Sequence, residues 1–374
     1  MTLNVLRKRK VKLTIHFVWM FIFILVGLIG SFFAYNSEVA FLDIINLSLK
    51  LFFYTALIAF INTEDKVFFV VKTFIFSGLI LAIRILIFTP LGNLGLERIG
   101  SSLDLNANGV GTIFIYSSIL SFFIGMKQKK YYFYIIGVFL LFLSLLSGSK
   151  AVFFLILVGL VTTILINIKT KMQAIIIIII PIITLGLYKF IMNISFFYNI
   201  LGHRIEGMIS VYTGSNIIDA STNTRLTMIQ EAWNLFKERS ILGYGLENFR
   251  LLSVFDSYSH NNYLELLSST GVLGTIVYYS LPVCLLSLSI KNRIKEENKN
   301  YNFIILLLIF VFTNDISSVT YKKITTQIII LLCMCYYSFL KERDNWSNYN
   351  IQDKLSENKL ENGGYNETFS KETS

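Results

Sequence analysis

Residues 13–33 read LTIHFVWMFIFILVGLIGSFF, a run without Asp, Glu, Lys or Arg. A helix of about 20 apolar residues is long enough to cross the hydrocarbon core of a bilayer. The basic stretch before this run, Arg7 to Lys12, is typical of a signal peptide. The run is longer than the apolar part of such a peptide and lacks a small-residue cleavage site, so we predict an anchored first helix.

Runs of the same kind recur along the chain. They are continuously apolar and do not alternate with polar residues, so they predict helices and not the strands of a barrel. We therefore predict an all-α, polytopic membrane protein of about 10 transmembrane helices. The predicted spans are 13–33, 39–61, 67–89, 108–126, 131–147, 151–168, 172–192, 264–290, 302–320 and 324–340.

The composition of the 374 residues agrees with this fold class. Hydrophobic residues make up 54% of the chain and charged residues only 15%, whereas soluble domains carry about 25% charged residues. This charge fraction excludes a soluble enzyme or a disordered protein as a description of the whole chain. The three cysteines lie in apolar runs and suggest neither a disulfide nor a zinc site.

The distribution of basic residues predicts the topology. With the N-terminus inside, the cytoplasmic segments contain 20 of the Lys and Arg residues, and the outer segments contain nine, of which five lie in one long loop. Short loops on the cytoplasmic side of a membrane carry an excess of Lys and Arg. We therefore predict a multi-pass protein of the cell membrane with both termini in the cytoplasm. The expected parts are a basic N-terminus (1–12), transmembrane helices 1–7 (13–192), a large extracytoplasmic loop (193–263), transmembrane helices 8–10 (264–340) and a disordered tail (341–374).

The long outer loop contains an amphipathic pattern. Within residues 223–239, Leu226, Ile229, Trp233 and Phe236 recur at helical spacing and form one apolar stripe. The loop as a whole has five basic and six acidic residues, a net charge of −1. An anion site in this loop would therefore need a few cations focused on one cavity.

Several motifs follow the predicted amphipathic helix. They are Gly243-Tyr244-Gly245 with Phe249, then His260-Asn261, then nine residues and Gly271-Val272-Leu273-Gly274. Together with an Asn-rich stretch at 104–111 and Ser147-Gly148-Ser149-Lys150, the pattern resembles the O-antigen polymerase and ligase superfamily (Wzy/WaaL type). This resemblance implies a GT-C-like glycosyltransferase that acts on the outer face of the membrane.

The resemblance also implies the substrates. The donor is a glycan linked to polyprenyl diphosphate (undecaprenyl diphosphate in this family), and the acceptor is the hydroxyl of a second glycan. The first interpretation is a polymerase of repeat units for O-antigen, capsule or exopolysaccharide. A ligase that transfers the glycan to a lipid, protein or wall acceptor is the alternative, and a polysaccharide flippase or transporter is the second alternative. Further partners consistent with the pathway are the membrane lipid, a flippase and a chain-length regulator, and we expect no nucleic acid.

Two residues are the candidates for catalysis. His260 would accept a proton from the acceptor hydroxyl or orient it, since histidine titrates near neutral pH. Arg225 would bind the diphosphate through its fixed fork of donors. The simpler interpretations are a histidine satisfied at the membrane interface and a solvated charge at the start of a helix.

Five further residues are candidates for substrate binding: Arg84, Arg98, Lys150, Asn261 and Asp315. Each also has a structural interpretation. Arg84 could extend its charge to the interface, Arg98 could be an exposed loop residue, and Asn261 could cap the next helix. Lys150 stands where the family has arginine and cannot form a bidentate clamp, and Asp315 could be a turn residue.

Four glycines complete the motifs: Gly243, Gly245, Gly271 and Gly274. We predict tight turns at the first pair and close approach of another helix at the second pair. The three histidines are far apart and no Asp-x-Asp pair occurs, so we predict a metal-independent reaction without a cofactor.

Overall fold

The computed structural model describes residues 2–89, 98–167, 170–213 and 220–368, and these residues form helices and no strand. The helices of the first part are α1 (Thr2–Phe32), α2 (Ser37–Phe60), α3 (Glu64–Phe88), the short 3-10 helix η2 (Ser101–Leu103), α4 (Ala107–Gln128), α5 (Tyr131–Leu146), α6 (Lys150–Asn167) and α7 (Thr170–Asn193). The remaining ones are α8 (Ser195–Phe197), the π-helix η3 (Tyr198–Gly202), α9 (His203–Thr213), α10 (Ala220–Glu238), α11 (Phe249–Leu252), α12 (Asn262–Lys295), α13 (Tyr301–Asp315) and α14 (Ile324–Thr368).

Each of the ten predicted apolar runs overlaps a helix, although the run 302–320 extends past the end of α13 at Asp315. Six helices in the described part are long and apolar enough to cross a membrane, namely α1, α2, α3, α4, α12 and α14. Helices α5, α6 and α13 are shorter and also apolar. The chain is therefore an all-helical, multi-pass membrane protein.

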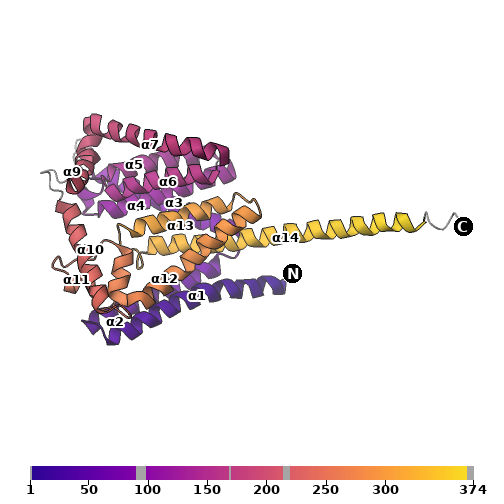
Figure 1. The fold of residues 1–374 in the computed structure, drawn as a ribbon, viewed down its shortest axis with the longest axis horizontal. Coiled ribbons are helices and arrows are strands. Elements are labelled where there is room, and N and C mark those ends of the chain that lie inside the picture. The colour runs from indigo at the N-terminus through magenta and orange to yellow at the C-terminus, as the bar shows by residue number, and fades with distance from the viewer. Residues whose placement is uncertain (1, 90–97, 168–169, 214–219, 369–374) are drawn as a thin grey trace.

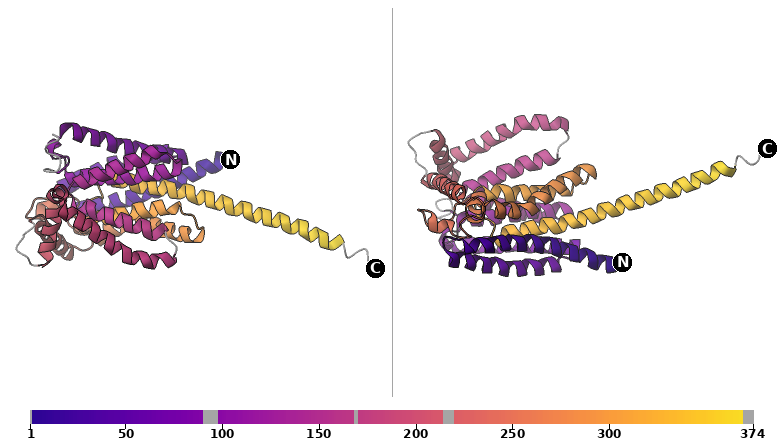
Figure 2. Two further views of the ribbon diagram at one scale, coloured as in Figure 1. Left: turned by 90° about the horizontal axis from the view of Figure 1, so that it is seen from above. Right: turned by 60° about the horizontal axis from the view of Figure 1, so that its bottom comes forward.

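The apolar helices lie side by side in a bundle (Figure 1). Helix α10 runs across one end of this bundle, with α9 and α11 beside it. The N-terminal end of α1 and the projecting part of α14 lie at the opposite end in every view (Figure 2). We call the end that carries α10 the loop end.

The predicted amphipathic helix is present as α10, with bounds close to those expected. The C-terminal tail differs from the prediction. Residues 341–374 were expected to be disordered because they are polar, but α14 continues without a break to Thr368. Glu, Lys, Gln and Leu in this stretch are good helix formers, so the local sequence is compatible with extending the helix that precedes it.

Asparagine side chains begin three helices at the loop end. Asn36 accepts from the Val39 amide at the start of α2, and Asn106 accepts from the Asn108 and Gly109 amides at the start of α4. Asn261 accepts from the Leu264 amide at the start of α12. Because the first amides of a helix have no partner within it, these caps fix where each helix begins.

Helix α12 is interrupted at Gly271, whose φ of 64° and ψ of −166° are not helical. The segment 240–245 pairs with the interruption through its backbone. The Val272 amide donates to the Ser240 carbonyl at 2.8 Å, and the Tyr244 and Gly245 amides donate to the Ser268 and Ser269 carbonyls at 2.8 Å. The backbone groups released by the break are thus satisfied inside the protein, as a membrane environment requires.

This arrangement corrects the prediction for Gly271 and Gly274. The expected partner was another helix, but the backbone of Ile241 in the turn at 240–244 approaches Gly271. A Cβ added to Gly271 would lie 2.1 Å from the Ile241 carbonyl oxygen, and one added to Gly274 would meet Thr270 of its own helix. The turn predicted at Gly243 and Gly245 is present, with φ values of 67° and 96°.

We predict that Gly271→Ala destabilises the protein. The backbone at Gly271 lies in a region open almost only to glycine, where another residue costs about 1–3 kcal/mol, and the new methyl group would also displace Ile241. Thermal unfolding in detergent should therefore occur at a clearly lower temperature than in the wild type.

Gly186→Ala is the matched control, because no atom beyond the local backbone of α7 lies within 4 Å of the Cβ position of Gly186. This variant should unfold like the wild type. Equal stability of the two variants would contradict the backbone pairing described for Gly271.

Candidate active site

His260 lies in the short loop that leads into α12, at the loop end of the bundle. Two contacts hold this loop in place: the Ser259 amide donates to Glu265 Oε2 at 2.8 Å, and Asn261 Nδ2 donates to the Ile316 carbonyl at 3.2 Å. His260 itself has a φ of 55°. Left-handed backbone is uncommon for a residue other than glycine and tends to occur at functional sites.

The imidazole of His260 lines a cavity of about 150 Å³. Pockets that enclose a whole small-molecule ligand are usually about 300–1,000 Å³, so this cavity suits the reacting groups and not an entire glycan. Segments from five parts of the chain form its wall. The lining residues are Asn106, Asn108, Gly109, Thr112, Ala151, Tyr258, His260, Asn314, Ser317, Ser318 and Lys323.

The surroundings of His260 disfavour its charged form. Burial, followed by the positive charges of Arg225 and Lys323, lowers the pKa of His260 to about 4. Burial is also the main cause that lowers the pKa of Lys323. At neutral pH the imidazole is therefore uncharged, and one of its ring nitrogens is able to accept a proton or a hydrogen bond.

Arg98 is fixed beside the same cavity. Its Nε donates to the Ser147 carbonyl at 2.8 Å, and its terminal NH2 nitrogen donates to Asn108 Oδ1 at 2.7 Å. Burial, with smaller effects from the charges of Arg204 and Arg225, lowers the pKa of Arg98 to about 10. Arg98 therefore remains charged at neutral pH and lies within electrostatic reach of two other guanidinium groups.

Lys150 connects the first turn of α6 to α10. Its Nζ donates to Thr222 Oγ1 at 2.8 Å, and Ala151, the next residue, lines the cavity. Thr222 precedes Arg225 by one helical turn. The Ser-Gly-Ser-Lys turn thus holds the start of α10, and with it Arg225, near His260.

We call Arg98, Arg204, Arg225 and Lys323 the cationic cluster. The charges that perturb Arg98 and His260 are all positive, so these cations repel one another, and Asp315 offsets part of this repulsion at Lys323. An anion with several negative oxygens relieves this repulsion, and arginine matches phosphate oxygens with paired donors. A diphosphate is the ligand chemistry that this arrangement suits.

Of the seven predicted catalytic and substrate-binding residues, only His260 lines the cavity. Arg98, Lys150 and Arg225 act on it from outside the lining, and the other three have different roles. Arg84 is exposed on the outer surface of α3, which favours the interpretation that its charge extends to the interface. Asn261 acts as the cap of α12. Asp315 is 0% exposed and accepts hydrogen bonds from Tyr279 at 2.7 Å, from Asn262 at 3.3 Å and from Thr320.

The structure points to Asn262 as a positioning residue that the sequence analysis missed. Its Oδ1 accepts from the Thr320 and Tyr321 amides at 2.8 and 2.9 Å, and its Nδ2 donates to Tyr279 and Asp315. These bonds tie the start of α12 to the connection between α13 and α14. The sequence showed two adjacent asparagines, Asn261 and Asn262. Only Asn261 has a recognisable local role as a helix cap, because the partners of Asn262 are distant in the sequence.

Lys323 and Asn314 were also missed, because both lie in or near a predicted span. Asn314 is 1% exposed, and its Nδ2 has no hydrogen-bond partner among the described residues. Since Asn314 lines the cavity with His260 and Lys323, this donor is available to an acceptor atom of a ligand.

Fold and site together define the chain as a multi-pass membrane protein with a cationic, histidine-containing pocket at one end of its bundle. Residues 135–279 match the family model described as O-antigen ligase. This segment contains Lys150, Arg225, His260 and Gly271, and the match confirms the resemblance to the O-antigen polymerase and ligase superfamily. No curated protein matches the chain.

We predict that Arg98→Gln weakens binding of a polyprenyl diphosphate without sugar by about tenfold or more, because a charge-assisted hydrogen bond contributes about 1.5–3 kcal/mol. Isothermal titration in detergent would measure this change. Arg84→Gln removes the same charge from an exposed position and should leave the affinity unchanged. Equal losses in both variants would indicate a general effect of net charge.

The neutrality of His260 predicts its reactivity. Diethyl pyrocarbonate modifies the uncharged imidazole, so the rate at His260 should show no fall between about pH 7.5 and 5.5, across the usual histidine pKa of about 6.5. Peptide mass spectrometry, with His260→Gln to assign the peptide, would follow the rate. A half-maximal rate near pH 6.5 in the free protein would contradict the pKa of about 4 given by burial and the two cations.

Proposed function

We propose that this protein is a glycosyltransferase that joins oligosaccharide repeat units carried on polyprenyl diphosphate. The observation that carries this proposal is the neutral His260 beside a cationic cluster, inside a segment that matches the O-antigen ligase family. The O-antigen polymerase and ligase superfamily supports a general role in sugar transfer, and the polymerase assignment is our own inference.

The proposed topology has ten spans with both termini in the cytoplasm and the loop end on the outer face. Two observations support it. The basic residues are concentrated in the segments assigned to the inside, and the N-terminal end of α1 and the projecting part of α14 lie at the opposite end of the bundle from α10 (Figure 1). The candidate site then faces the compartment in which nucleotide sugars are absent, so the reaction needs a donor that is already activated.

The reaction follows from the groups present. The acceptor hydroxyl attacks C1 of the donor sugar, a new C–O bond forms, and the bond from C1 to the diphosphate breaks. The hydroxyl proton passes to His260, and the leaving polyprenyl diphosphate takes the electron pair of the broken bond. Cations placed where this negative charge develops provide the main stabilisation of the transition state, so we assign that role to the cationic cluster, without a metal ion.

The cationic cluster also affects the pKa of His260. A histidine with a pKa of about 4 is a weak base, but two of the causes of that value are the charges of Arg225 and Lys323. A bound diphosphate offsets these charges and raises the pKa of His260 toward the range in which a general base is effective. The base thus becomes competent when the donor is in place.

A ligase is the second candidate function, because the matching family model is described as O-antigen ligase. The chemistry at His260 is the same in both cases, and only the acceptor differs. A flippase is disfavoured by the concentration of the described site at one end of the bundle, since transport would need polar groups along the path across the membrane. A flippase and a chain-length regulator are proposed as partners in the pathway.

The test is incubation of the purified protein with repeat units on polyprenyl diphosphate, in the presence of a chelator. A ladder of lengthening glycans on gels is the result expected of a polymerase. Transfer only after addition of a lipid, peptide or wall acceptor would instead establish a ligase. Loss of single units without any new glycosidic bond would overturn both functions.

His260→Ala should lower the rate of transfer by a factor of about 10²–10⁴, the usual contribution of a general acid or base. His203→Ala is the matched control, since His203 is exposed on α9 and does not line the cavity. We expect normal rates for this control. A His260→Ala protein that folds and retains full activity would exclude the assigned role.

A further inference from the structure

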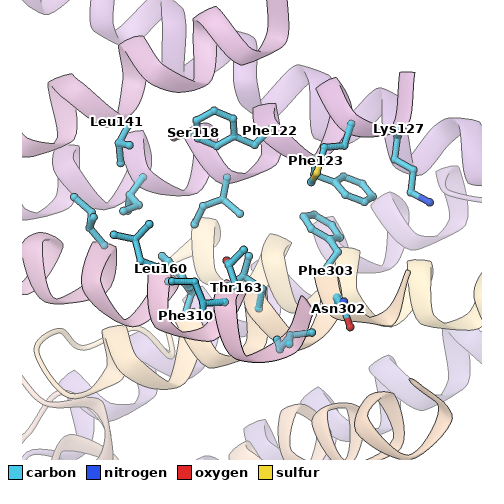
Figure 3. A pocket seen from close by; sticks show the side chains of 18 of the residues that line it. Ser118, Phe122, Phe123, Lys127, Leu141, Leu160, Thr163, Asn302, Phe303 and Phe310 are labelled. Carbon is cyan, nitrogen blue, oxygen red and sulfur yellow. The ribbon is translucent and has the colours of Figure 1, made fainter. Parts of the chain in front are cut away.

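A second and larger cavity, of about 730 Å³, lies between α4, α5, α6 and α13. Figure 3 shows side chains of α4 and α5 on one side of it and side chains of α6 and α13 on the other. Its wall is mostly apolar, with the rings of Phe122, Phe123, Phe303 and Phe310 among the lining residues. Lys127 and Asn302 lie toward one end of the cavity (Figure 3).

Along three helices, the residues that line the large cavity follow those that line the His260 cavity. On α4 the last residue of the His260 cavity is Thr112 and the first of the large cavity is Ile115. On α6 the corresponding residues are Ala151 and Ile156. At a rise of about 1.5 Å per residue, these steps are about 4.5 and 7.5 Å along the helix axes.

Helix α13 shows the same order from its opposite end, with Asn314 in the small cavity and Phe310 in the large one. Three helices therefore contribute to both cavities in the same sequence from the loop end inward. Along α4 the large cavity continues from Ile115 to Lys127, which is about 18 Å of a hydrocarbon core about 30 Å thick.

We propose that the large cavity binds the polyprenyl tail of the donor whose diphosphate occupies the cationic cluster. This inference rests on the proposed function for the identity of the lipid. A diphosphate held at the loop end places the first isoprene units of its lipid beside Thr112 and Ala151. From there the tail enters the apolar space between α4, α6 and α13.

The occupant follows from the order of the two cavities along α4, α6 and α13. Lys127 and Lys299 line the far end of the large cavity, where Lys127 Nζ donates to Asn300 Oδ1. An isoprenoid chain needs no polar partner at its terminus, so its end can stop short of these residues.

The affinity of this cavity for one lipid over another depends on van der Waals packing and not on the hydrophobic effect. A tail that leaves the bilayer for the protein moves between two apolar environments, so the gain comes from packing of its branched chain against side chains such as the phenylalanine rings. Filling part of the space should therefore weaken binding of a long chain while leaving the chemistry unchanged.

The first test compares two donors that carry the same glycan diphosphate, one on a long polyprenyl chain and one on a geranyl chain. Leu160→Trp adds bulk to the cavity from a side chain that is 46% exposed, so the buried core stays intact. We expect the KM for the long donor to rise about tenfold, with the geranyl donor and kcat unaffected.

Leu165→Trp is the matched control. Leu165 lies on the same helix, is 40% exposed and does not line the cavity. Its KM values should equal those of the wild type. Equal effects of Leu160→Trp on both donors, or no effect on either donor, would overturn the proposed tail site.

A second test does not depend on sugar transfer. A sugar-free polyprenyl diphosphate with a photoreactive group in its tail should crosslink to peptides of α4, α6 and α13, in wild type and in His260→Ala alike. Crosslinks confined to α1, α2 or α3 would overturn the inference even if the transferase is active. Crosslinks at the cavity without any transferase activity would support the tail site and reject the proposed function.

Discussion

Burial of neighbouring positive charges at the loop end is the constraint on which the site depends. Arg98, Arg204 and Arg225 come from different segments, yet each of the latter two affects the first. Holding like charges together away from bulk water is unfavourable, and the protein does so through fixed hydrogen bonds such as those from Arg98 to Ser147 and Asn108. The arrangement therefore favours binding of an anion, and we propose that a bound anion raises the pKa of the adjacent His260 imidazole.

Polar side chains within the helical bundle maintain this geometry. Asn262 and Asp315 connect α12, α13 and the segment between α13 and α14, and Asp315 has three hydrogen-bond donors around it. Buried polar groups are costly when unpaired and rigid when fully paired. The network therefore fixes the connection that carries Lys323 relative to the loop that carries His260.

Much of this fold follows from local features of the sequence. The apolar runs, the amphipathic stripe of α10 and the cap at Asn261 depend on neighbouring residues in one helix, so the sequence alone predicts them. Arg84 and Arg98 were equally plausible contacts of the substrate, because the side of the bundle that each faces depends on distant helices. The same limit applies to Asn262, to Lys323 and to the true partner of Gly271, all of which require knowledge of which segments pair across the bundle.

The turn between α1 and α2 has a consequence for biogenesis. The Tyr35 amide donates to the Tyr244 carbonyl, and the Asn36 amide donates to Asn248 Oδ1, a partner 212 residues later in the chain. At a synthesis rate of about 5–20 residues per second, the first two helices wait ~10–40 s in the membrane before this partner exists. The loop end of the molecule is thus completed late, after most of its helices have been made. The turn between α1 and α2 stays uncovered until the segment that contains Asn248 has been synthesised.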